Sequence, residues 1–157
     1  MKKKLFALIA VSALLLTGCG DKKVSASADN LPTVTTNQGE APTIGAPTGT
    51  PPSTLVTKDI IVGTGAEALP TSTMTVHYTL MTWSNGKLIE SSWTSGSPAT
   101  FPLANVIVGW QQGIPGMKVG GRRLLVIPPD LGYGAQGGGP IGPNETLIFV
   151  VDAIGVA

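Results

Sequence analysis

The sequence predicts an α+β domain, in which an antiparallel sheet of about five strands curls around one short α-helix. Three observations lead to this prediction. Residues 73–80 alternate polar and apolar side chains, Asn85-Gly86 is a typical hairpin turn, and outside the expected strands only residues 108–114 allow a helix. A period of two is typical of a strand with one buried face, and Asn-Gly favours the tight turn that joins antiparallel strands.

The first expected element, residues 1–18, has the layout of an export signal, with lysines followed by an apolar run and small residues. The run from Leu5 to Leu16 would form about 18 Å of helix, which is shorter than the ~30 Å hydrocarbon core of a membrane. Leu16-Thr17-Gly18-Cys19 resembles a bacterial lipobox. This resemblance implies a lipoprotein signal peptide over 1–18, lipid on Cys19 and an extracytoplasmic, lipid-anchored protein. A free or buried thiol is the alternative.

Residues 19–53 follow the cysteine and are rich in Pro, Thr, Gly, Ser and Ala. Their few apolar residues neither alternate nor recur at helical spacing. A segment of this composition cannot bury a core of its own. We therefore expect a disordered tether that spaces a folded domain, residues 54–157, from a surface.

The expected sheet begins with residues 73–80, where Met74, Val76, Tyr78 and Leu80 share one face and His77 points to the other. Asn85-Gly86 is expected to form a two-residue type I′ turn, because both of its central positions need positive φ. The chain would then return through residues 87–90. These two strands are expected to pair.

Three further elements follow. A helix is expected over residues 108–114, where Pro115-Gly116 ends it, and a helix this short needs tertiary packing to be stable. Residues 122–127 form a strand that Pro128-Pro129 closes. Residues 146–154 form another, with Leu147, Phe149 and Val151 on one side.

Composition excludes several classes of function. The formal net charge is +1, and Lys2, Lys3 and Lys4 supply three of the ten basic residues, so no basic surface for nucleic acid remains in the domain. The domain has one histidine and no cysteine, which excludes a His/Cys metal cluster and leaves a serine triad dependent on His77 alone. Nothing singles out a carboxylate pair for glycoside chemistry. No cofactor or metal is expected.

Residues 132–137 match the pattern G-x-G-x-x-G of dinucleotide-binding proteins. That fingerprint requires a following helix, which the run Gly138-Gly139-Pro140-Ile141-Gly142-Pro143 cannot form. The segment is therefore interpreted as a loop of about ten residues, and loops of this kind are more often functional than connecting segments are.

Taken together, the motifs resemble an FKBP-type peptidyl-prolyl cis/trans isomerase across essentially the whole domain. The segments that carry this resemblance are Val76-His77-Tyr78-Thr79, Asn85-Gly86-Lys87, Val106-Ile107-Val108-Gly109-Trp110, residues 113–120, Arg122-Arg123, Ile127-Pro128-Pro129 and Leu131-Gly132-Tyr133-Gly134. The resemblance implies the FKBP-like fold, with a half-open sheet around one helix. It also implies an apolar cleft for the proline ring of a substrate.

The resemblance also implies roles for single residues. Trp110 would form the floor of the cleft and Tyr78 and Phe149 its walls, although plain core packing is the alternative for both walls. Val106 and Ile107 would form a rim with a backbone N–H donor, and Ile141 would close the loop side. The substrate-binding candidates are Tyr78, Ile89, Val106, Ile107, Trp110, Tyr133, Ile141 and Phe149, and the catalytic candidates are Tyr78, Glu90 and Tyr133.

Three positions depart from the family pattern. Ile89-Glu90 stands where a Phe-Asp pair is frequent, and Ala99 stands where a second aromatic residue often lines the cleft. A wider and less aromatic pocket is therefore expected. These departures favour the alternative function, a non-catalytic proline-peptide binding or chaperone module on the same fold.

The function implied by the resemblance is peptidyl-prolyl isomerisation that assists the folding of exported proteins. Its partners would be proline-containing unfolded or exported polypeptides, macrolides as candidate ligands, and a membrane reached through the lipid anchor. A solute-binding lipoprotein would need two lobes, for which the domain is too short. A monomer is expected.

Overall fold

Six antiparallel strands form one sheet in this computed structural model, which describes residues 30–157. The strands are β1 Val56–Ile61, β2 Thr73–Thr82, β3 Leu88–Ser91, β4 Ala99–Pro102, β5 Arg122–Ile127 and β6 Leu147–Val156. The helices are α1 Ser92–Ser95 and α2 Val108–Gly113, with 3-10 turns η2 Leu103–Asn105 and η3 Pro129–Leu131. The expected fold class is confirmed, and the sequence analysis missed β1, β4 and α1. None of the helices in the described part of the chain is long and apolar enough to cross a membrane.

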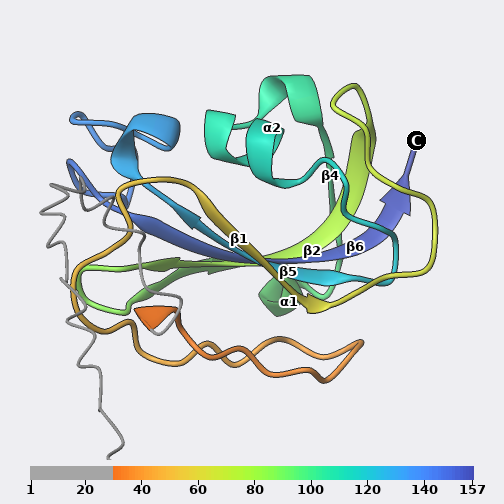
Figure 1. Ribbon diagram of the computed structural model, residues 1–157, viewed down its shortest axis with the longest axis horizontal. Helices are drawn as coiled ribbons and strands as arrows, with labels where there is room; N and C mark the ends of the chain where they lie inside the picture. Colours follow the sequence, from red (N-terminus) through yellow and green to blue (C-terminus); the bar gives the residue numbers. More distant parts are fainter. Residues whose placement is uncertain (1–29) are drawn as a thin grey trace, which may run out of the picture.

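The strands lie in the order β1-β5-β6-β2-β3, and β4 pairs with a second stretch of β2. Helix α2 covers one face of the sheet and an N-terminal segment lies over the other (Figure 1). We call the face under α2 the inner face and the opposite one the outer face. Strand β6 lies between β5, which precedes it directly along the chain, and β2, which is far from it in sequence, so long-range pairing with β2 holds the centre of the sheet together.

Strand β6 is apolar on both faces of the sheet. Leu147, Phe149 and Val151 belong to the inner cluster of buried residues, whereas Ile148 and Val150 belong to the outer one. The expected alternation along this strand is confirmed. Because both of its faces are apolar, each needs a cover that excludes water.

Helix α2 can cover the inner face because two of its glycines allow close approach to β5. A Cβ atom on Gly109 would lie 2.5 Å from Ile127 Cγ2, and one on Gly113 would lie 2.5 Å from Leu125 Cδ2. Close approach also brings Trp110, between the two glycines, onto the inner cluster. The short helix is therefore fixed by packing, as its length requires.

The hairpin between β2 and β3 forms, but its expected type I′ turn was wrong. Only Gly86 has positive φ, at 63°, and the loop extends over residues 83–87. The Asn85 side chain accepts hydrogen bonds from Thr82 Oγ1 at 2.7 Å and from the Lys87 N–H at 2.8 Å. An Asn side chain that satisfies the neighbouring backbone stabilises a longer loop, which competes with the two-residue turn.

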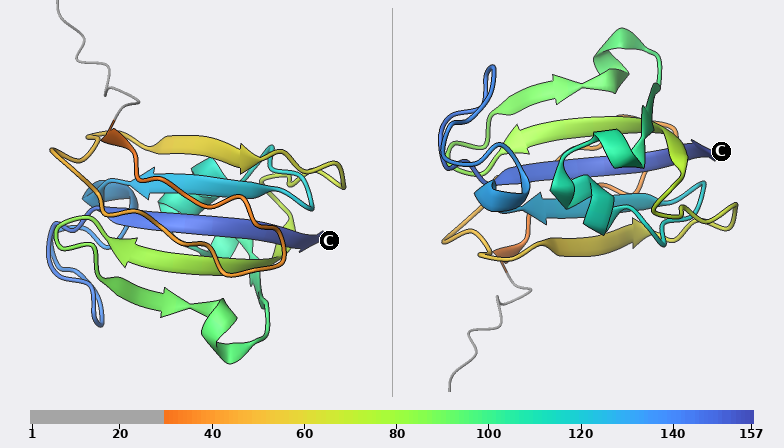
Figure 2. Two further views of the ribbon diagram at one scale, coloured as in Figure 1. Left: turned by 90° about the horizontal axis from the view of Figure 1, so that it is seen from below. Right: turned by 90° about the horizontal axis from the view of Figure 1, so that it is seen from above.

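Residues 30–53, which we call the strap, lie across the outer face of the sheet (Figure 2). Leu31, Val34 and Ile44 pack against Trp83, Leu124, Val126, Ile148 and Val150. The expectation of a disordered tether is therefore wrong for this part of the segment. The strap has five prolines, all at least half-buried, so it adds to an existing core although it cannot form one. Cys19 and residues 1–18 lie outside the described residues.

Arg122 holds the strap to the sheet. Its fully buried guanidinium donates to Thr35 O at 2.9 Å, to Glu40 O at 2.7 Å and to Asp152 Oδ1 at 2.7 Å. Burial raises the pKa of Asp152 although Arg122 opposes this shift, and Asp152 Oδ2 is buried without a hydrogen-bond partner. Because burying two charges is costly, the three acceptors around Arg122 are what makes this arrangement stable.

We predict that Arg122→Met lowers the free energy of unfolding by about 3–5 kcal/mol, because the carboxylate of Asp152 would stay buried without its cation. Urea denaturation measures this change. Lys118→Met is the matched control, because Lys118 forms only an exposed ion pair with Glu67 at 4.0 Å and its removal should cost about 0–1 kcal/mol. Proteolysis within the strap should accelerate in the first variant only. Equal stability of the two variants would contradict the prediction.

Candidate active site

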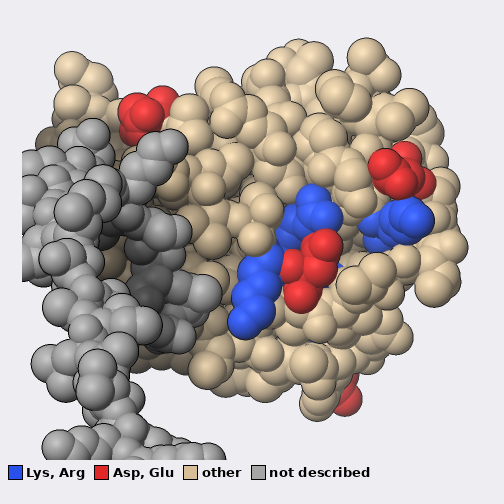
Figure 3. Space-filling view, in the orientation of Figure 1, with Lys and Arg blue, Asp and Glu red and all other residues tan. Residues whose placement is uncertain are grey.

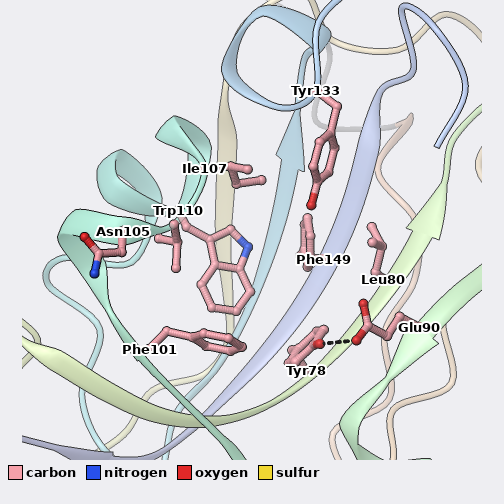
Figure 4. A pocket seen from close by; sticks show the side chains of 10 residues that line it. Tyr78, Leu80, Glu90, Phe101, Asn105, Ile107, Trp110, Tyr133 and Phe149 are labelled. Carbon is pink, nitrogen blue, oxygen red and sulfur yellow. Dashed lines mark hydrogen bonds between the residues drawn. The ribbon is translucent and has the colours of Figure 1, made fainter. Parts of the chain in front are cut away.

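A cleft with a volume of about 340 Å³ opens on the inner face of the sheet, beside α2 (Figure 4). Its walls come from β2, β3, β4, β6, η2, α2 and the loop after η3. The lining residues are Tyr78, Leu80, Glu90, Phe101, Asn105, Val106, Ile107, Trp110, Tyr133 and Phe149. A pocket of this size is large enough for a proline ring and its neighbouring peptide groups.

Trp110 forms the floor of the cleft and is only 4% exposed. Three aromatic rings meet it edge to face: Tyr78 at 5.8 Å, Phe101 at 5.9 Å and Phe149 at 5.3 Å between ring centroids. Such contacts are the preferred geometry of aromatic pairs and fix the plane of the indole. The indole is therefore packed from below and available to a ligand from the cleft side (Figure 4).

Tyr78 and Glu90 form a polar pair in one wall. The Tyr78 hydroxyl donates to Glu90 Oε1 at 2.6 Å, and the two residues lie on the paired strands β2 and β3. Burial raises the pKa of Tyr78 well above its usual value, and the hydrogen bond and negative charge of Glu90 raise it further. The phenol consequently stays protonated, so it serves as a hydrogen-bond donor and not as a base.

Tyr133 directs its hydroxyl into the cleft from the loop after η3, and its side chain is 41% exposed (Figure 4). The loop backbone is held by a hydrogen bond from Gly134 N–H to Pro129 O at 2.7 Å and one from Asn144 N–H to Gly134 O at 2.9 Å. Gly138 lies against the ring, since a Cβ atom there would be 3.0 Å from Tyr133 Cδ1. The loop thus presents one neutral donor at the mouth.

Val106 and Ile107 form the rim next to the floor. Ile107 immediately precedes α2, and its carbonyl accepts the N–H groups of Trp110 at 3.0 Å and Gln111 at 3.2 Å. Its own N–H makes no hydrogen bond within residues 30–157. A rim donor is thereby available beside the apolar floor.

The structure brings most of the expected site residues together, but two lie elsewhere. Ile141 is 6% exposed and packs in the inner cluster, and Ile89 is half-buried beside the same cluster, so neither lines the cleft. Sequence reasoning missed Leu80, Phe101 and Asn105. Leu80 was already on the expected inner face of its strand, whereas no short-range signal pointed to the other two.

Ala99 does not leave the cleft poor in aromatic residues, as the sequence analysis expected. Phe101 lies two positions further along β4, on the same face of the strand, and supplies an aromatic wall. Its ring also contacts Tyr78 at 6.0 Å. Four aromatic rings therefore surround the floor and mouth of the cleft beside the indole.

Glu90 is the one charged residue in the lining of the cleft. On the face shown in Figure 3, basic side chains lie beside acidic ones and form no extended basic surface. His77 faces away from the cleft, where its ring stacks on Trp93 at 3.9 Å and its Nδ1 pairs with Ser92 Oγ at 2.9 Å. Within residues 30–157, no group of three potential metal-ligating side chains comes together.

Comparisons with known proteins agree with this geometry. The family model described as FKBP-type peptidyl-prolyl cis-trans isomerase matches residues 65–154. A probable FK506-binding protein of Corynebacterium glutamicum is 50% identical over 115 residues, which cover 73% of this chain and 98% of that protein. The outer membrane protein MIP of Legionella longbeachae is 44% identical over 106 residues, which cover 67% of this chain but only 45% of that protein.

A solved structure has a similar fold. The crystal structure of AtFKBP13 superposes with a TM-score of 0.61 and 40% sequence identity, covering 68% of this chain and 96% of that one. Residues 65–154, which the family model matches, contain the floor, walls and mouth of the cleft, whereas the strap precedes them in the sequence. The chain therefore belongs to the FKBP-type peptidyl-prolyl cis-trans isomerase family.

Proposed function

We propose that this isomerase acts by enclosing the proline of an X-Pro bond against Trp110 and lowering the barrier to rotation of the preceding amide. The observation that carries the proposal is the cleft itself: aromatic rings surround a buried indole, and neutral hydrogen-bond donors stand at its edge. No nucleophile is required, because rotation about the C–N bond breaks only amide resonance.

The rotation barrier is ~18–20 kcal/mol, and the uncatalysed reaction takes about 10–100 s. The planar amide is more charge-separated than the twisted one, so an apolar cleft disfavours the ground state more than the transition state. Each ~1.4 kcal/mol of such a difference accelerates the reaction tenfold. The rings around Trp110 supply this environment.

Two donors would orient the substrate in the cleft. Tyr133 is placed to donate its hydroxyl to a substrate carbonyl, and the free Ile107 N–H is placed to bind a second one. Tyr78 is committed to Glu90, which fixes the wall opposite the rim. These donors would hold the substrate backbone on either side of the proline while the amide bond that precedes the proline rotates.

A non-catalytic binding or chaperone module is the second candidate. Glu90 favours it, because its carboxylate carries a charge into the wall of a cleft whose proposed mechanism depends on an apolar environment. In that case the same contacts would hold a proline segment without accelerating its rotation. A direct rate measurement separates the two functions.

We predict that the purified protein accelerates X-Pro isomerisation in a protease-coupled peptide assay, and that Tyr133→Phe lowers kcat/KM about two- to tenfold. This range corresponds to the loss of one hydrogen bond between neutral groups. The free energy of unfolding should not change, because the Tyr133 hydroxyl is exposed at the mouth of the cleft. If the wild type is no faster than buffer but still binds the peptide, the binding module is the correct function.

A second prediction concerns the protonation of Tyr78. Because burial and Glu90 both disfavour the phenolate, Tyr78 should release its proton only at a pH well above the usual pKa of about 10. Ultraviolet absorbance titration measures this step, and Tyr78→Phe should remove it. Glu90→Gln should shift the step to lower pH, since it removes the negative charge and leaves burial unchanged. A titration at the ordinary tyrosine pH would show that Tyr78 is not held in this way.

We further propose that the protein is an extracytoplasmic lipoprotein anchored through Cys19, acts as a monomer, and assists the folding of exported proline-containing chains. The lipobox-like Leu16-Thr17-Gly18-Cys19 supports the anchor, and the similarity to an outer membrane protein supports the location. Relatives named FK506-binding protein support a macrolide as a ligand of the same cleft.

We predict that Cys19→Ala moves the protein from the membrane fraction to the soluble fraction. Attachment through two or three acyl chains is stable, whereas the chain without them has only its signal sequence to hold it. Immunoblots of fractionated cells, with Cys19→Ser as a second thiol-free variant, measure the distribution. An unchanged membrane fraction would exclude lipidation as the anchor.

A further inference from the structure

We propose that the cleft selects proline bonds flanked by lysine or arginine, and that Glu90 makes this selection. The proposal rests on the isomerase function proposed above and names the class of substrate for the same cleft. It follows from the charge distribution in the site and not from the shape of the cleft.

Glu90 is the only charged residue among the ten that line the cleft. The others are apolar or aromatic, apart from Asn105 and the two tyrosines. Tyr78 contributes no charge because its raised pKa keeps it protonated. A substrate therefore meets a single negative charge in an otherwise neutral cleft.

Glu90 takes part in no ion pair within residues 30–157. The three ion pairs within residues 30–157 join Lys118 to Glu67, Arg122 to Asp152 and Arg123 to Asp59. Both arginines and one lysine are thereby committed to other carboxylates. The same part of the chain has seven Asp and Glu against five Lys and Arg, so its overall charge also favours a cationic partner.

The carboxylate is positioned for a second partner. Oε1 accepts the Tyr78 hydroxyl at 2.6 Å, which fixes the orientation of the group, and Oε2 makes no hydrogen bond within the described residues. Glu90 lies across the cleft from Asn105 and Ile107, with Oε2 directed away from Tyr78 (Figure 4). A lysine or arginine next to the bound proline could place its alkyl stem on the apolar wall and its charge on Oε2.

The effect should be moderate, because Glu90 is exposed to solvent although it lies in the wall, and water screens the pair. Exposed ion pairs correspond to about a two- to fivefold change in an equilibrium constant. We expect kcat/KM for a peptide with Lys or Arg beside proline to exceed that for an uncharged analogue by this factor. A peptide with Glu at the same position should be worse than the uncharged one by a similar factor.

The test uses the full chain and two peptide series, Ala-X-Pro-Ala and Ala-Pro-X-Ala, in which X is Lys, Arg, Met or Glu. NMR exchange measures isomerisation without a coupled protease, and the quenching of tryptophan fluorescence measures binding of the same peptides. Glu90→Gln keeps an acceptor for the Tyr78 hydroxyl but removes the charge. Glu67→Gln is the matched control, because it removes the same charge at a residue that does not line the cleft.

The proposal expects a preference for Lys and Arg in at least one series that is lost in Glu90→Gln, kept in Glu67→Gln and lost in 1 M salt, where the screening length is only about 3 Å. Equal rates for all X in the wild type, or a preference that persists in Glu90→Gln, would overturn it. If no peptide is isomerised, the proposed function fails, and the binding constants of the same peptides then decide the charge preference independently.

Discussion

The structure depends on a sheet that is apolar on both faces and must be covered on both. Strand β6 imposes this constraint, because its alternate residues enter the inner and the outer cluster and its two neighbours, β5 and β2, are fixed to it in register. Burial of apolar area is the main favourable contribution to folding, so an uncovered face would forfeit much of it. One short helix covers the inner face, and the strap covers the outer face.

The cleft is a consequence of how incompletely α2 covers the inner face. A helix of six residues cannot span the sheet, so the aromatic side chains beyond its end are packed from below and open above. Trp110 is part of both the core and the cleft, since its side chain is nearly fully buried and still forms the floor of the cleft. The glycines on either side of it, Gly109 and Gly113, let the helix approach β5 closely enough to hold the indole in place.

Local patterns in the sequence predicted the elements whose signals are short-range. The alternation of β2 and β6, the proline stop after β5 and the placement of α2 are all properties of neighbouring residues, and all were confirmed. The strap was mispredicted because its prolines, threonines and isolated apolar residues become ordered only on a distant surface, through Arg122 and the outer cluster. Phe101 was missed for the same reason, since the pairing of β4 with β2, and not its local sequence, turns it into the cleft.

The strap and the cleft lie on opposite faces of the sheet (Figure 1, Figure 2). Strand β5 carries both attachments: Arg122, at its start, holds the strap on the outer face, and Ile127, at its end, meets Gly109 of α2 on the inner face. The described chain therefore enters the domain on the side opposite the cleft. Because the sheet stands between the strap and Trp110, the strap leaves the cleft open (Figure 1).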